Sequence, residues 1–340
     1  MSIDLRYHGR WIVTGLWDAL GRPPRYRRAM ALIGQSAGDN GAVAPAPGWA
    51  GVGTVTLREL SGHYHLAGAR RCDQHVLVLV TVGHGQHEID FRPYACRPGT
   101  LLWVRPGQVV RFGGSAGLDA IVVCWEPSAV AEVADDPALL DGGLGPACWQ
   151  LAGEDEDAVI NEVSQLVVDC QRHRSGTLAA GLLRHQLAVL LLRIALLPGR
   201  GPAERNDAYV RFRLEVEKDY TRTRRVEEYA ERMGYSVRTV TRACLAATGR
   251  SAKQVIDDRV TLEAMRLLAV TDDPIADIGR RLGFPEPTNF GRFFHREAGT
   301  SPGAFRSAQR PPPRNALPAQ RRPATADLHG RPTPRVTGEA

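Results

Sequence analysis

The stretch RVEEYAERMGYSVRTVTRACLAAT, residues 225–248, predicts two short helices joined by a tight turn. Its first half places apolar residues at helical spacing on one face: Val226, Tyr229, Ala230 and Met233. Gly234 follows, and glycine readily adopts the left-handed conformation that often ends a helix. Ser236 supplies a hydroxyl that can cap a second helix over Val237–Ala247. A helix, a turn containing glycine and a second helix form the helix-turn-helix pattern.

The second helix of this pair is expected to turn a polar face outward. Val240 and Cys244 occupy its inward positions. The exposed positions carry polar and basic residues: Arg238, Thr239, Thr241 and Arg242. Such a face is typical of a recognition helix that enters the major groove of DNA.

The pattern repeats further along the chain. Asp272-Asp273-Pro274 is a helix start signal, and Gly283 stands where Gly234 stands in the first motif. The apolar residues between them again share one face: Ile275, Ile278 and Leu282. Pro287 or Thr288 is expected to open the second helix, and Gly299 and Pro302 are expected to end the unit. Its inward residues are phenylalanines and its outward ones are polar: Phe290, Phe293 and Phe294 against Asn289 and Arg292.

Residues 251–270, between the two motifs, also have apolar residues at helical spacing. A helix of ~20 residues is ~30 Å long. Successive major-groove faces on one side of B-DNA are ~34 Å apart. One helix of this length therefore permits two recognition helices to lie in adjacent grooves.

Charge and cysteine content narrow the class of protein. Residues 209–309 hold 18 Lys and Arg against 14 Asp and Glu, whereas residues 1–208 are slightly acidic. A basic C-terminal part suits contact with nucleic-acid phosphate. The six cysteines are scattered without a C-x-x-C pair, which favours a reduced, cytoplasmic protein. The longest apolar stretch, Leu187–Leu197, contains Arg193 and is too short to cross a membrane.

Residues 51–126 have the pattern of a β-domain, with glycine- and proline-containing turns between short runs. The runs predict strands over Val52–Leu60, His75–Val82, Thr100–Val104, Val109–Phe112 and Leu118–Trp125. Several short strands at this spacing favour a small sandwich or barrel.

Two helices are expected after the strands. The first carries apolar residues at helical spacing behind an acidic first turn: Val159, Val163, Leu166, Val167 and Cys170. The second, about Thr177–Leu197, is apolar around most of its circumference and must be covered. Either the strands of the same chain cover it, or a second copy of the chain does, as in a homodimer.

Residues 228–306 resemble the DNA-binding domain of AraC/XylS-type transcription regulators. The likeness is carried by Ser236 with Val240-Thr241-Arg242, by Thr248–Ser251, Arg259–Leu268, Ile278–Phe284 and Phe290–Phe294, and by Gly299–Arg306. The departures are Cys244, where a phenylalanine is usual, and Pro285, Pro287 and Gly291 around the second recognition helix. Residues 75–129 are similar to the cupin-like effector domain of the same family, on segments 83–85, 87–91, 97–102 and 105–109.

The resemblance implies a one-component transcription regulator without cofactor or enzymatic activity. Its implied partners are double-stranded promoter DNA, RNA polymerase and a small-molecule effector. The family's base-contacting positions fall on Arg238, Thr241, Arg242, Thr288, Asn289 and Arg292. Thr239 is expected to contact the DNA backbone. Arginine typically pairs with guanine, which favours Arg242 and Arg292 as base readers. Arg259 is expected to donate structural hydrogen bonds between the two halves.

Three classes of enzyme are alternatives to this interpretation. A metal-dependent cupin-type enzyme fused to a DNA-binding domain would draw ligands from His63, His65, His84, His87 and Glu88. Residues 34–38 and 113–117 fit G-x-S-x-G, but a nucleophile elbow needs a strand before it and a helix after it. The first match is followed by a Gly-, Ala- and Pro-rich stretch, and the second is a glycine turn between two strands. A DNA-repair methyltransferase regulator would need a cysteine in a catalytic motif, and none of the six has such surroundings.

The expected fold class is α+β: a small cupin-like β-barrel with following helices, then an all-α domain of two helix-turn-helix motifs joined by a long helix. The expected divisions are a mobile leader, a ligand-sensing domain, a helical pair, a linker, the DNA-binding domain and a disordered Pro- and Arg-rich tail. Their bounds are 1–50, 51–150, 151–198, 199–208, 209–307 and 308–340, respectively.

Overall fold

The computed structural model describes residues 51–63, 68–113, 117–130, 145–173, 176–197 and 206–310. The expected leader, most of the expected linker and nearly all of the expected tail lie outside these residues. So do His65, residues 34–38 and part of the glycine turn at 113–117.

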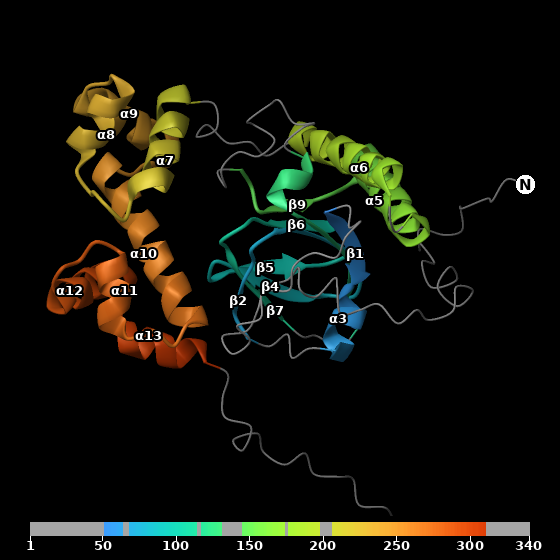
Figure 1. The fold of residues 1–340 in the computed structure, drawn as a ribbon, viewed down its shortest axis with the longest axis horizontal. Coiled ribbons are helices and arrows are strands. Elements are labelled where there is room, and N and C mark those ends of the chain that lie inside the picture. The colour runs from blue at the N-terminus through green and yellow to red at the C-terminus, as the bar shows by residue number, and fades with distance from the viewer. Residues whose placement is uncertain are drawn as a thin grey trace, which may run out of the picture. The chain divides into compact units, whose positions relative to one another are not determined.

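The strands form two antiparallel sheets (Figure 1). The five-stranded sheet has the order β1 (Val52–Thr56), β8 (Asp119–Trp125), β3 (His75–Val82), β6 (Thr100–Val104) and β9 (Cys148–Gln150). The four-stranded sheet has the order β2 (Arg70–Arg71), β7 (Val109–Phe112), β4 (Gly85–Ile89) and β5 (Arg92–Cys96). The expected cupin-like β-domain is present, and in the described residues its sheets pack as two layers without closing into a barrel.

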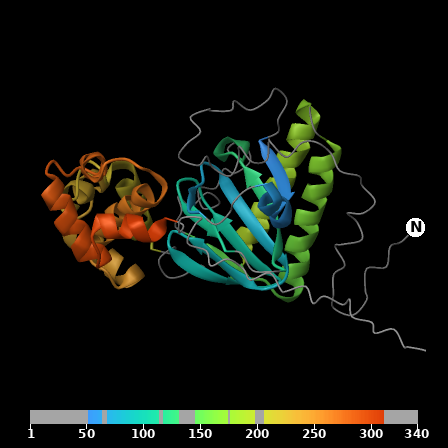
Figure 2. The same cartoon turned by 90° about the horizontal axis from the view of Figure 1, so that it is seen from below.

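Strand β3 is buried on both faces through residue 80, which explains its apolar run VLVLV at residues 76–80. Val76 and Val78 point into the interior between the two sheets. Leu77 and Leu79 point the other way, into a core shared with helices α5 (Gly153–Arg172) and α6 (Thr177–Leu196). Both views show this helix pair against one face of the five-stranded sheet (Figure 2).

Helix α6 is long and apolar enough to cross a membrane by length and composition, a test that core helices of soluble proteins also pass. Its inward residues are buried in the core with the sheet and α5: Leu183, Leu187, Leu190, Leu191 and Ile194. The β-domain thus covers one side of the helix.

One strand prediction was too long. Residues Leu57–His63 form helix α3 instead of continuing β1 to Leu60. The cause is a capping box, in which the Thr56 hydroxyl accepts from the Glu59 backbone N–H and the Glu59 carboxylate accepts from the Thr56 N–H. A short 3-10 helix, η1 (Pro127–Val130), follows β8.

The remaining described residues form seven helices around one hydrophobic core. They are α7 (Asp207–Asp219), α8 (Val226–Met233), α9 (Val237–Thr248), α10 (Ala252–Val270), α11 (Ile275–Arg281), α12 (Pro287–Ala298) and α13 (Pro302–Gln309). The α8–α9 and α11–α12 pairs are the two helix-turn-helix motifs, and α10 joins them. The Arg259 guanidinium binds Glu217 of α7, at 2.7 Å from Nε to Oε2, in the structural role expected of it.

One more helix follows the second motif. Gly299 does end α12 in a left-handed conformation, but Pro302 opens another helix, α13. Proline is well suited to the first position of a helix, where its missing N–H would have no partner. The Ser301 side chain caps this helix, and Phe305 enters the core.

Gly234 and Gly283 form a matched pair for testing the two turns. Both are left-handed, with φ of 70° and 79°, respectively. A Cβ on Gly283 would lie 2.3 Å from the Thr221 carbonyl oxygen, whereas one on Gly234 would meet nothing within 4 Å. We expect Gly234→Ala to cost ~1 kcal/mol of unfolding free energy from backbone strain. Gly283→Ala should cost roughly 1 kcal/mol more, because the backbone must also move. Urea unfolding measures both, and equal losses would contradict the role of the Thr221 contact.

Candidate DNA-binding interface

The recognition helices α9 and α12 begin with different caps. At α9 the Ser236 hydroxyl accepts a 3.1 Å hydrogen bond from the Thr239 N–H and lies 2.9 Å from the Thr239 hydroxyl. The side chain of Thr239 is therefore already engaged in the cap. At α12 Pro287 occupies the first turn and Glu286 is the N-cap. Gly291, Pro285 and Pro287 thus do not prevent a regular helix of 12 residues.

The residues expected to contact DNA lie on these two helices. Arg238, Arg242 and Arg292 are exposed, as are Thr288 and Asn289 in the first turn of α12. Thr239 and Thr241 are half-buried. The first turn of a recognition helix contributes many of its base contacts, so the placement of Thr288 and Asn289 suits their expected role. All seven assignments remain predictions.

The arginines of this unit fall into two groups. Within the described part of the chain, Arg238, Arg242 and Arg292 make no ion pair or hydrogen bond. Most of the other exposed arginines are paired with carboxylates: Arg222 and Arg232 with Asp219, Arg225 with Glu228, Arg250 with Asp258, Arg280 with Asp277, Arg281 with Asp273, and Arg296 with Glu297. The motif places Arg238, Arg242 and Arg292 toward DNA, so their charges, which are unpaired among the described residues, are available to a ligand.

A basic groove with a volume of about 760 Å³ lies between the two motifs. Its lining includes Asn289 and Arg292 of α12, so it opens beside the second set of expected readers. Its other basic residues come from the α7–α8 connection and from α10 and α12: Arg222, Arg224, Arg225, Lys253 and Arg296. This groove suits the phosphate backbone between two adjacent major grooves.

Sequence reasoning missed this groove, although the run Thr221-Arg222-Thr223-Arg224-Arg225 was a signal for it. Arg224 also holds the two motifs together. Its guanidinium lies 3.8 Å from the centroid of the Phe284 ring and donates a 3.3 Å hydrogen bond to the Gly283 carbonyl. Burial lowers the pKa of this guanidinium. Arg224 is thus partly structural and only partly available to phosphate.

Among the residues that the structure describes, the interior between the two sheets is apolar and contains one buried histidine without a hydrogen-bond partner. Neither ring nitrogen of His87 has a partner in the described residues, and its ring lies edge-on to Phe112 at 5.2 Å. His75, by contrast, accepts a 3.1 Å hydrogen bond from Trp103 and stacks on Trp125. A buried polar group without a partner is costly, so the surroundings of His87 suit a ligand that supplies one.

The histidines expected for a metal enzyme are not brought together. His84 is exposed in the turn before β4, whereas His87 is buried inside the sandwich. The side chains of His63 and His65 lie outside the described residues. Among those that are described, no group of three or more metal-type ligands converges. Burial also raises the pKa of all six cysteine thiols, which disfavours the thiolate that a cysteine nucleophile requires.

Two buried histidines predict a loss of stability in acid. Burial lowers the pKa of His87 to about 4, and burial with the Arg105 charge does the same for His75. An unfolded histidine has a pKa of ~6.5, so the unfolded chain binds more protons between pH ~6.5 and ~4. The stabilisation from neutral histidine is therefore complete above pH ~6.5 and is lost as the pH falls toward ~4. Urea midpoints at several pH values measure this, and His87→Leu should reduce the slope whereas His84→Ala should not.

Comparison with known proteins agrees with both halves of this architecture. Residues 229–308 match the family model "Helix-turn-helix domain", and residues 52–188 match "AraC-like ligand binding domain". The HTH-type transcriptional activator RhaS of Salmonella agona is 28% identical over 247 residues, which cover 70% of this chain and 86% of RhaS. RhaS of Salmonella typhimurium has the same identity and coverage.

Two solved structures are also similar. The DNA-binding domain of AdpA, solved in complex with a target DNA, is 29% identical and covers 32% of this chain and 93% of its own, with a TM-score of 0.27. ToxT from Vibrio cholerae O395, bound to (E)-4-(8-methylnaphthalen-1-yl)but-3-enoic acid, is 12% identical and covers 76% of this chain and 100% of its own, with a TM-score of 0.41.

A β-domain of the ligand-binding type followed by paired helix-turn-helix motifs defines a one-component, sequence-specific DNA-binding regulator of transcription. The chain belongs to the AraC/XylS family of transcription regulators.

Proposed function

We propose that the chain is a cytoplasmic transcription activator that reads two adjacent major grooves of promoter DNA and acts with RNA polymerase. The observation that carries the proposal is a set of three exposed arginines on α9 and α12, Arg238, Arg242 and Arg292, which have no ion-pair or hydrogen-bond partner among the described residues. Arg242 and Arg292 read base edges, Arg238, Thr241, Thr288 and Asn289 support them, and Thr239 contacts the backbone. The activity is that of a regulator, without catalysis.

Binding to genomic fragments over a range of salt concentrations tests the proposal. Neutralised phosphates release counterions, so the affinity is expected to fall steeply as salt rises. Fragments recovered at high salt should share a sequence, because base contacts persist when phosphate attraction is screened. Recovery of no sequence-selective fragment would exclude the proposed function.

A small-molecule effector is proposed to bind in the interior between the two sheets, against His87. Phe112 and Ile89 line the same apolar interior. The chemistry of these residues favours a largely apolar molecule with one hydrogen-bonding group, because it would satisfy a ring nitrogen that has no partner in the described residues. His87→Leu should abolish the response to the effector while leaving DNA binding in its absence unchanged.

The outer face of α6 is proposed to form a homodimer. The sheet covers one side of this helix, but an apolar row remains exposed on the other: Leu178, Leu182, Val189, Leu192 and Leu196. Leu178 and Leu196 are 90% and 85% exposed. With His185 at the remaining position, the whole row follows the alternating four- and three-residue spacing of a coiled-coil seam.

We expect Leu182→Glu combined with Leu192→Glu to convert a dimer to a monomer, because two charges would enter the apolar seam. Sedimentation equilibrium measures the change. Leu245→Glu, at a half-exposed position on α9, is the matched control and should leave the oligomeric state unchanged. A wild-type chain that is monomeric at all concentrations would contradict this interface.

A further inference from the structure

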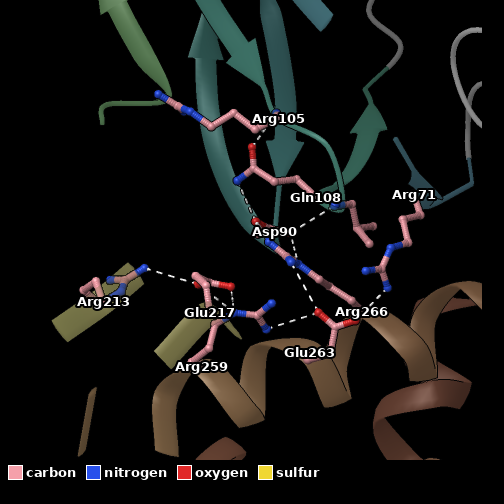
Figure 3. A network of polar contacts seen from close by, with 10 residues as sticks. Arg71, Asp90, Arg105, Gln108, Arg213, Glu217, Arg259, Glu263 and Arg266 are labelled. Atoms are coloured by element: carbon pink, nitrogen blue, oxygen red, sulfur yellow. Dashed lines mark hydrogen bonds and ion pairs between the residues drawn. The ribbon is translucent and has the colours of Figure 1, made fainter. Parts of the chain in front are cut away.

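Buried ion pairs join the β-domain to helix α10 (Figure 3). Asp90 lies in the turn between β4 and β5, and Arg266 lies on α10. Arg266 Nε donates to Asp90 Oδ1 at 2.9 Å, and Nη2 donates to Oδ2 at 2.8 Å. Both side chains are only 9% exposed. Two parallel hydrogen bonds between guanidinium and carboxylate fix orientation as well as distance.

The β-domain itself holds the Asp90 carboxylate in position. Oδ1 also accepts from the Val109 N–H at 3.0 Å, and Oδ2 accepts from the Gln108 amide at 2.7 Å. The Gln108 side chain is held in turn, because its oxygen accepts from the Arg105 N–H at 2.7 Å. The carboxylate is thus preorganised to receive a guanidinium from outside the domain.

On α10 the network continues through Glu263. Its carboxylate accepts from Arg71 of β2 at 2.7 Å and from Arg259 at 3.1 Å, and it lies 3.4 Å from Arg266. Arg259 donates in turn to Glu217 of α7 at 2.7 Å and 2.8 Å. The contact therefore reaches both the helix between the motifs and the helix that precedes the first motif.

The same turn makes an apolar contact. Asp90 and Phe91 have φ values of 49° and 65°, which are uncommon for residues other than glycine. Phe91 packs on the core of the helical unit, with its ring 5.3 Å from that of Phe305 in α13. Arg111 of β7 donates to Gln309 of α13 at 2.6 Å. Backbone strain of this kind persists where surrounding contacts impose it, often at switch regions.

The turn lies directly beside the interior of the sandwich. Ile89 precedes Asp90 and pairs with Val110 across β4 and β7, and both side chains are buried in the interior cluster. A ligand that displaces either strand would move the Asp90 carboxylate, and a two-bond ion pair tolerates little displacement. Arg242 and Arg292 are exposed when Asp90 and Arg266 are in contact, so this contact leaves the recognition helices accessible to DNA.

We infer that Asp90 and Phe91 form a latch that docks the β-domain on α10 and α13 and thereby transmits the state of its interior to the DNA-binding unit. The regulatory part of this inference rests on the proposed function. The docked form braces α7, α10 and α13, so it is the form that binds promoter DNA more tightly.

The test measures backbone hydrogen exchange and DNA affinity of the full chain carrying Asp90→Asn, Arg266→Ala or both. Asp90→Asn keeps the shape of the side chain and removes its charge. Asp90→Asn should speed backbone hydrogen exchange in α13 about tenfold. Arg266→Ala should speed exchange of the Val109 amide by a similar factor. In each variant the altered residue and the measured amides lie on opposite sides of the contact. The double variant should add little to either single one. Asp273→Ala, which breaks an exposed ion pair within the helical unit, is the matched control and should change neither.

For DNA affinity, the probe is a genomic fragment selected by the wild-type chain. The latch variants should bind it about fivefold more weakly, and the control should bind it normally. Unchanged exchange across the contact would overturn the latch. Faster exchange with unchanged affinity would overturn its regulatory part. If the wild-type chain selects no fragment, the proposed function fails, while the exchange measurement still decides whether the latch exists.

Discussion

Replacing Arg242 with alanine is expected to weaken binding to a selected promoter fragment by roughly 5- to 150-fold, which corresponds to ~1–3 kcal/mol. The guanidinium is exposed on α9 and has no ion-pair or hydrogen-bond partner in the described residues. It is therefore free to make two hydrogen bonds to a guanine edge. Arg292→Ala on α12 should have an effect of similar size at a second position. Titrations against fragments with single base changes measure the affinity and locate each position.

The distribution of the loss among sequences decides the role of each arginine. A base reader loses discrimination at one position, so the variant should bind fragments altered there as well as it binds the original. If instead all sequences weaken equally and the salt slope falls by about one, the arginine contacts phosphate. Arg281→Ala is the control, since this exposed arginine is paired with Asp273 at 2.9 Å. Its removal should change affinity little.

The helix-turn-helix motifs could be predicted closely because their signals are local. The Ser236 hydroxyl caps the helix that follows it, and Gly234 and Gly283 both adopt the left-handed turn. Each of these depends on hydrogen bonds within a few residues, so a short stretch of sequence contains the relevant atoms. The error in β1 was also local in origin, since Thr56 starts a helix where a strand was expected.

The contacts between distant segments could not be predicted in the same way. Asp90 and Arg266 are 176 residues apart, and no local sequence pattern indicates that they form a pair. The strands β4 and β5 were not expected, because the polar residue His87 occupies a buried position of β4 and Pro93 stands within β5. The basic groove likewise combines α10 with the α7–α8 connection and α12. Tertiary packing, rather than local propensity, sets these features.

Phe290→Ala is expected to remove ~3–5 kcal/mol of unfolding free energy, the usual range for a buried phenylalanine. The ring is fully buried, with centroids 5.4 Å from Phe284 and 6.0 Å from Phe294. Its Cβ lies so close to α11 that a Cβ added to Gly279 would be only 3.0 Å away. The two helices of the second motif therefore rest on this side chain, and its loss leaves a cavity that they cannot easily fill.

Both motifs share one hydrophobic core, so the consequence should extend beyond α12. A loss of ~3–5 kcal/mol is a large part of the ~5–15 kcal/mol that stabilises a typical domain. Circular dichroism in urea should show the transition of the helical unit at a much lower midpoint, and the folded fraction able to bind DNA should fall with it. Leu245→Ala, at a half-exposed position on α9, should stay within ~0.5 kcal/mol of wild type. A similar loss of unfolding free energy in both variants would mean that the core does not depend on Phe290. The turn between α11 and α12 alone would then set the angle between these helices.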